Sequence, residues 1–111
     1  MVSITYRREH LPHKNVGYHL TAEGHAGYAS PGNDDIVCAS VSTMFYTLAN
    51  YLEFIGADEL EADDEDTFSI DCKGLFHDEK VHSAFQMTVF GLSLLEEQYP
   101  DYVSVTIDPD E

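Results

Sequence analysis

Basic residues are scarce in this chain. Five lysines and arginines stand against 21 aspartates and glutamates, which gives a formal net charge of −16. A protein that binds nucleic acid neutralises phosphates with Lys and Arg, and the basic residues at positions 7, 8, 14, 73 and 80 form no dense patch. Nucleic acid is therefore not the expected partner. The charge favours a strongly basic polypeptide instead, although an acidic surface also serves solubility alone.

Cysteines and long apolar runs are few as well. Cys38 and Cys72 have no C-x-x-C spacing, so we expect no disulfide framework, and a reducing compartment fits. The chain lacks a signal-peptide pattern and any apolar run long enough to span a bilayer, which favours a cytoplasmic protein without a membrane segment. No repeat or low-complexity linker divides the 111 residues, so we expect one domain over residues 1–111.

Metal-ligating residues are present without the spacing of a metal site. His19 and His25 are both expected to lie near the site of Cys38. A zinc site needs four converging ligands, however, and the sequence offers only His25 and Cys38. The acidic run at 58–66 lacks the glycine turn and distal glutamate of a calcium loop. We therefore expect neither a metal nor another cofactor.

The hydrophobic pattern predicts an α+β fold in the order β-β-α-β-β-α-β. Period-two alternation predicts strands near residues 2–7, 18–22, 67–72 and 103–107, with an acidic edge strand near 59–64. Helical periodicity predicts two long helices, from Asp35 to Ile55 and from Asp78 to Tyr99, which Gly56 and Pro100 would end. The expected architecture packs both helices on a mostly antiparallel sheet.

Each predicted helix has an apolar stripe that should face the sheet. The first stripe consists of Val37, Val41, Phe45, Leu48 and Leu52, widened by Met44 and Tyr51. The second consists of Val81, Phe85, Thr88, Leu92, Leu95 and Tyr99. Cys72 lies in a strand pattern and is expected to be a core residue.

Residues 24–42 carry the chemistry of the sequence. A loop with His25 leads into the first helix, whose first turn contains Cys38. The thiolate is the nucleophile of cysteine chemistry, and a free cysteine is only slightly ionised at neutral pH, so a neighbouring imidazole supplies the base. The helix N-terminus also favours an anion, and its free amides could receive an oxyanion. The alternative is a small core cysteine beside an ordinary loop histidine.

These residues resemble the ribosomal-processing cysteine protease Prp family. The resemblance rests on the run Gly24-His25-Ala26-Gly27-Tyr28-Ala29, on Gly32, on Asp35-Ile36-Val37-Cys38-Ala39 and on Ser42. It implies a small homodimeric endopeptidase that removes a short N-terminal extension from the precursor of a large-subunit ribosomal protein, cutting after a hydrophobic stretch rich in phenylalanine. The implied nucleophile is Cys38, and the implied base is His25.

The segment between His25 and Cys38 is about one residue longer than is usual in that family. We assign the family's aspartate to Asp35, because it directly precedes the Ile-Val-Cys run, and expect it to support the site or only to cap the helix, while Asp34 is expected to be a helix cap or a bystander. Ser42, one turn after Cys38, is expected to be a supporting residue, although a helical serine often bonds its own backbone.

The glycines of the loop have two possible uses. Gly24, Gly27 and Gly32 precede a helix as in phosphate-binding loops, but the aspartates at 34–35 and the lack of a lysine argue against that use. In a protease they would form a mobile loop that admits a polypeptide before His25 closes on the thiol. Two other functions remain open: a non-catalytic acidic module that binds basic ribosomal proteins, and a thiol-dependent acyl transferase.

Overall fold

The predicted element order is confirmed. The computed structural model describes residues 1–27, 35–63, 67–75 and 78–108. The strands are β1 (Val2–Leu11), β2 (Asn15–Glu23), β3 (Asp58–Asp63), β4 (Phe68–Leu75) and β5 (Val103–Ile107), and the helices are α1 (Ile36–Phe54) and α2 (Glu79–Gln98). A short 3₁₀ turn (Pro12–Lys14) joins β1 to β2, with His13 and Lys14 in the left-handed region.

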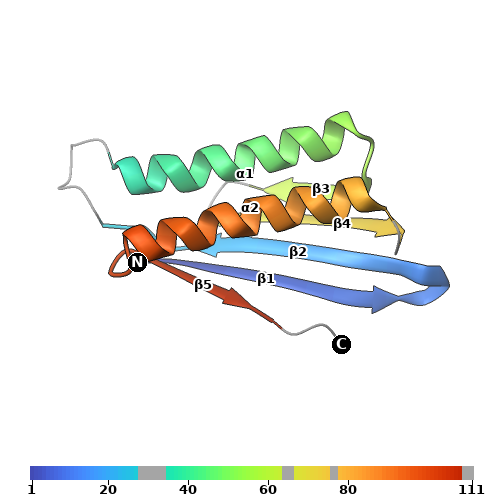
Figure 1. Ribbon diagram of the computed structural model, residues 1–111. Helices are drawn as coiled ribbons and strands as arrows, with labels where there is room; N and C mark the ends of the chain where they lie inside the picture. Colours follow the sequence, from blue (N-terminus) through green and yellow to red (C-terminus); the bar gives the residue numbers. More distant parts are fainter. Residues whose placement is uncertain (28–34, 64–66, 76–77, 109–111) are drawn as a thin grey trace.

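The strands form one mostly antiparallel sheet. Its order is β3-β4-β2-β1-β5, and β5 is the strand that pairs in parallel, with β1. Both helices lie on the same face of this sheet (Figure 1), with α1 over the β3–β4 side and α2 toward β5. The α+β architecture therefore has two layers, and in the described residues the outer face of the sheet carries no helix.

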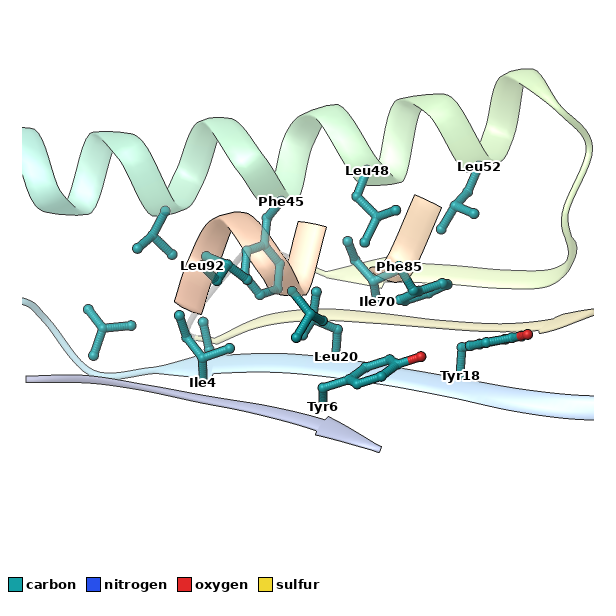
Figure 2. Close-up of a cluster of buried hydrophobic side chains, with 14 of the residues drawn as sticks. Ile4, Tyr6, Tyr18, Leu20, Phe45, Leu48, Leu52, Ile70, Phe85 and Leu92 are labelled. Atoms are coloured by element: carbon teal, nitrogen blue, oxygen red, sulfur yellow. The ribbon is translucent and has the colours of Figure 1, made fainter. Parts of the chain in front are cut away.

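The core fills the space between the helices and the sheet. Inward residues of β1 and β2 alternate with polar ones, so Ile4, Tyr6, Tyr18 and Leu20 point toward the helices (Figure 2). The ring of Phe85 from α2 stacks on Tyr18, with centroids 4.9 Å apart. All five residues of the predicted α1 stripe are buried, from Val37 through Val41, Phe45 and Leu48 to Leu52, and so is Cys72.

Two predicted core positions are wrong. Val89, not Thr88, continues the buried stripe of α2, because positions 85, 89 and 92 share one helix face. Thr88 instead faces the groove beside α1 and donates a hydrogen bond to the carbonyl oxygen of Ala84 at 2.8 Å. Tyr51 is 42% exposed and lines the same groove, whereas Met44 packs against the core as expected.

The acidic edge strand is present as expected. Among the strands that the structure describes, β3 lies at the edge of the sheet and pairs with β4, and its register shifts between Asp58 and Glu61, where Glu59 has a left-handed backbone. Lys73 of β4 forms an ion pair with Glu59 at 2.7 Å. Charges and a bulge on an edge strand discourage pairing with other chains.

Candidate active site

Cys38 lies in the first turn of α1, where the helix N-terminus favours an anion. The helix begins after Asp35, whose extended backbone makes it the N-cap residue. Its Oδ1 accepts hydrogen bonds from the backbone N–H groups of Val37 and Cys38, both at 3.0 Å. The interpretation of Asp35 as a helix cap is therefore confirmed, and one of the two amides that it caps is that of Cys38 itself.

The sulfur of Cys38 accepts a hydrogen bond from the chain segment that contains His25. The backbone N–H of Ala26 lies 3.4 Å from Sγ. Ala26 is only 3% exposed and belongs to the hydrophobic core, and the thiol is partly buried. The fold thus brings Cys38, the predicted nucleophile, into contact with Ala26, which follows the predicted base His25.

The segment with His25 and Ala26 follows the end of β2, and close packing against the backbone of Met1 holds it there. Gly24 has a φ of +90°, and a Cβ at this position would lie 2.6 Å from the carbonyl oxygen of Met1. Another side chain is therefore excluded there by both conformation and space. The nitrogen of Met1 donates a hydrogen bond to the carbonyl oxygen of His25 at 2.7 Å. These contacts hold the backbone at Gly24 and at the carbonyl group of His25.

The His25 side chain is exposed. Within residues 1–27 and 35–63, no hydrogen bond joins its imidazole to the Cys38 sulfur. Gly27 has a left-handed φ of +69°, whereas Gly32 and Asp34 lie outside the described residues. Ser42 is half-buried one turn after Cys38 on α1. The structure therefore brings together Cys38, Asp35 and the backbone beside His25.

Sequence reasoning missed Ala26. Its contribution to the site is a backbone amide, which every residue but proline carries, so the residue type gives no direct signal. A small apolar residue between His25 and Gly27 was the one available hint of a buried anchor. The expectation that the helix amides are free for an oxyanion also needs correction, because Asp35 occupies those of Val37 and Cys38.

His19 does not lie at this site, contrary to expectation. It points to the outer face of the sheet, where its ring nitrogens contact carboxylates of Glu9 and Asp71. The hydrogen bond from His19 lowers the pKa of Glu9. In the described part of the chain, no three His, Cys, Asp or Glu side chains gather in a way that could hold a metal ion.

The second cysteine has the properties of a core residue. Burial raises the pKa of the Cys72 thiol to about 12, and the nearby carboxylates of Asp71 and Asp78 act in the same direction. A thiol held neutral in this way is a poor nucleophile. The environments of the two cysteines thus favour Cys38 as the reactive one.

An aromatic pocket of about 210 Å³ opens between α1 and the β3–β4 pair. Phe45, Tyr46 and Phe68 line it, with Asp63 among the polar lining residues. Tyr46 meets Phe68 edge to face, with ring centroids 5.6 Å apart. Phe45 follows Cys38 by seven residues on α1, so the pocket lies about 10 Å along the helix from the thiol.

Apolar side chains are exposed between the two helices, and α1 carries little charge. Glu53 is the one charged residue among the 19 of α1. A groove of about 840 Å³ runs between α1 and α2, and Tyr51, Met87, Phe90 and Leu94 expose apolar surface in it. No helix within the described ranges is long and apolar enough to cross a membrane. Exposed apolar surface of this kind is typical of an interaction site.

Comparisons with known proteins agree with this arrangement. The model of the family described as cysteine protease Prp matches residues 1–104. The crystal structure of SMU.848 from Streptococcus mutans is similar, with a TM-score of 0.72 and 31% identity, covering 100% of this chain and 96% of that one.

Two further structures share the fold. The ribosomal processing protease Prp from S. aureus in complex with a covalently linked product peptide has a TM-score of 0.69 at 22% identity, covering 95% of this chain and 99% of that one. Its complex with a substrate peptide has a TM-score of 0.69 at 18% identity, with the same coverage. No curated protein sequence matches the chain.

Proposed function

This chain belongs to the cysteine protease Prp family and is a cysteine-type peptidase, and from that premise we propose that it removes the N-terminal extension of a large-subunit ribosomal protein precursor during ribosome biogenesis in the cytoplasm. The observation that carries the proposal is the contact between Ala26 N–H and the Cys38 sulfur. It joins a thiol at a helix N-terminus to the segment that bears His25. The S. aureus relative, which shares the fold, is described as a ribosomal processing protease.

The mechanism uses Cys38 as nucleophile and His25 as base. His25 takes the thiol proton, and the sulfur attacks the scissile carbonyl to form a tetrahedral intermediate. Collapse of this intermediate breaks the C–N bond while His25 protonates the leaving amine. Water then hydrolyses the thioester and regenerates the thiol. Asp35 supports the site by fixing the first turn of α1, in which Cys38 lies, and Ser42 supports it from the next turn.

Closure of the His25 ring on the sulfur requires rotation of its side chain, because the backbone at Gly24 and His25 is held by Met1. We propose that the loop moves at Gly27, whose φ is positive, and at Gly32, which lies outside the described residues, whereas Gly24, the third glycine expected to move, stays in place. The exposed position of the His25 ring supports a site that completes itself when a polypeptide binds.

The substrate's apolar residues fit the aromatic pocket. An extended peptide advances about 3.3 Å per residue, so about three residues span the 10 Å between Cys38 and the pocket beside Phe45. A substrate that runs along α1 would thus place one large apolar side chain among Phe45, Tyr46 and Phe68. The strongly acidic composition would attract the basic body of a ribosomal protein.

A homodimer is part of the proposal, through the outward faces of α1 and α2. Two copies that each carry a net charge of −16 repel one another except where charges are few. The groove with Tyr51, Met87 and Phe90 is such a region. Sedimentation should therefore give a dimer for the wild-type chain and a monomer for Phe90→Glu. A Phe90→Glu variant that remains dimeric would show that the dimer interface lies elsewhere.

The test of function is mass spectrometry of a basic ribosomal-protein precursor that bears its N-terminal extension. The wild type should remove the extension, whereas Cys38→Ala and His25→Ala should leave it intact. Cys72→Ala and His13→Ala are the matched controls, because Cys72 is a core thiol and His13 lies in the β1–β2 turn. Both should cleave like the wild type. If the reduced wild-type enzyme leaves the precursor intact, the hypothesis that this protein cleaves that substrate is rejected.

The competing function is an acidic module that binds basic proteins without cleaving them. A hollow of about 560 Å³ on the outer sheet face supports it, since Glu9, Glu59, Glu61 and Asp71 line it. Charge reversal at Glu61 separates the two functions. If it abolishes biological function while Cys38→Ala does not, the binding module is the better description. A thiol-dependent acyl transferase would differ by passing the acyl group to an added amine instead of water.

A further inference from the structure

Two amides at the N-terminus of α1, those of Val37 and Cys38, are not free to bind an oxyanion. An oxyanion hole needs N–H donors aimed at the oxygen on which negative charge develops. The amides of Val37 and Cys38 would be the obvious donors, but each already donates to Oδ1 of Asp35 at 3.0 Å. An amide of a neighbouring segment could take this role instead.

Ala26 provides such a donor. Its N–H lies 3.4 Å from Sγ of Cys38, and the residue is buried in the core with an exposure of 3%. The preceding peptide is held by the hydrogen bond from Met1 to the His25 carbonyl, and Gly24 packs against the Met1 backbone. The amide is thus fixed in place before any substrate binds, which is the condition for effective electrostatic catalysis.

Resting on the proposed peptidase function, we propose that the backbone N–H of Ala26 is an oxyanion-hole donor. In the resting enzyme it donates to the Cys38 sulfur, and it keeps this contact while His25 takes the thiol proton. On attack, a sulfur electron pair forms the S–C bond, and the carbonyl π pair moves to oxygen. That oxygen is two bonds from the sulfur, so a small shift brings it to the roughly 2.7–3.1 Å that a donor requires.

The donor returns to the sulfur as the intermediate collapses. The oxygen lone pair then rebuilds the carbonyl, the C–N bond breaks, and His25 delivers its proton to the leaving nitrogen. One amide therefore serves the thiolate and the oxyanion in turn. The directed hydrogen bond thus comes from the segment beside α1, and not from the helix amides that Asp35 caps.

A backbone ester at position 26 tests this role. Replacing Ala26 by lactic acid in the full chain exchanges the N–H for an oxygen and keeps the methyl group. The matched control is lactic acid at Ala39, whose amide donates to the Asp35 carbonyl at 2.9 Å in the same helical turn but does not contact the sulfur. Each chain is assayed for acylation of Cys38 by 4-nitrophenyl acetate and for its alkylation by iodoacetamide.

The two reagents separate the two roles of the amide. Acylation passes through an oxyanion, whereas alkylation depends on the thiolate alone. We expect the ester at 26 to slow acylation about 10²-fold, the typical effect of removing one oxyanion donor, and to slow alkylation much less. The ester at 39 should change both rates alike and slightly. Ala26→Gly, which keeps the N–H, should stay closer to the wild type than the ester at 26.

Equal losses in acylation and alkylation for the ester at 26 would overturn the proposal, since the amide would then act on the thiolate only. Acylation no slower than in the ester at 39 would overturn it as well. This assay needs no ribosomal protein. A wild type that is acylated readily but leaves the precursor intact would therefore reject the proposed substrate and not the role of Ala26.

Discussion

The two helices of this protein begin with the same device, which makes a matched pair of substitutions possible. Asp35 caps α1 through the amides of Val37 and Cys38, and Asp78 caps α2 through those of Lys80 and Val81. The two carboxylates differ mainly in their surroundings, because only Asp35 lies beside the predicted nucleophile. We therefore expect Asp35→Ala and Asp78→Ala to have similar effects on stability and different effects on the thiol.

The effect on stability follows from the cap bonds. Replacing an aspartate N-cap by alanine costs about 1 kcal/mol. Unfolding entropy near 2.1 cal/mol/K per residue gives about 230 cal/mol/K for a chain of this length, so each variant should lose about 4 °C in Tm. The bonds of Asp35 are shorter, at 3.0 Å against 3.2 and 3.4 Å for Asp78, so its loss should be the larger of the two.

The assays are thermal melting followed by circular dichroism, and the pH profile of alkylation by iodoacetamide. The carboxylate of Asp35 opposes a second negative charge nearby, so Asp35→Asn should alkylate faster than the wild type at a given pH. Asp78→Asn should alkylate like the wild type. An unchanged Tm for Asp35→Ala would refute the cap, and identical alkylation of the two Asn variants would refute any influence of Asp35 on the sulfur.

Three further predictions follow from the burial of particular side chains. Because burial raises the pKa of the Cys72 thiol to about 12, the native protein at pH 8 should gain one iodoacetamide label, on Cys38, whereas the protein unfolded in urea should gain two. The same pKa shift should make the free energy of unfolding fall as the pH rises from about 9 toward 12, and this fall should be less steep in Cys72→Ala. Phe85→Ala should cost about 3–5 kcal/mol in a denaturant titration, since the fully buried ring stacks on Tyr18. Phe68→Ala should raise KM for the precursor, whereas Phe54→Ala, at a position 86% exposed, should not; equal KM values would exclude the aromatic pocket as a substrate site.

The fold was largely predictable because its signals are local and agree with one another. Alternation in β1 and β2, the α1 stripe and two aspartate caps all specify the same order of elements, which the structure confirms. The errors occur where two residues satisfy one pattern. Thr88 and Val89 both follow Phe85 at helical spacing, and only the packing of α2 against the sheet places Val89 inside.

Part of the site was predictable for a different reason. A cysteine in the first turn of a helix after an N-cap aspartate follows from side-chain chemistry alone, and the structure has that arrangement. His19 was misplaced because nearness in sequence says little about which face of a strand a side chain occupies. Alternation from the buried Tyr18 and Leu20 puts His19 on the outer face, beside Glu9 and Asp71.

The contribution of Ala26 has a physical reason for being invisible in the sequence. A backbone donor has no residue type, so its position depends on what holds the chain: a buried methyl group at Ala26, a forbidden Cβ at Gly24, and the hydrogen bond from Met1 to His25. The carboxylate of Asp35, which caps the start of α1, also occupies the amide of Cys38. Stability of the helix and stabilisation of an oxyanion compete for the same N–H groups, and a second segment that supplies its own amide resolves the competition.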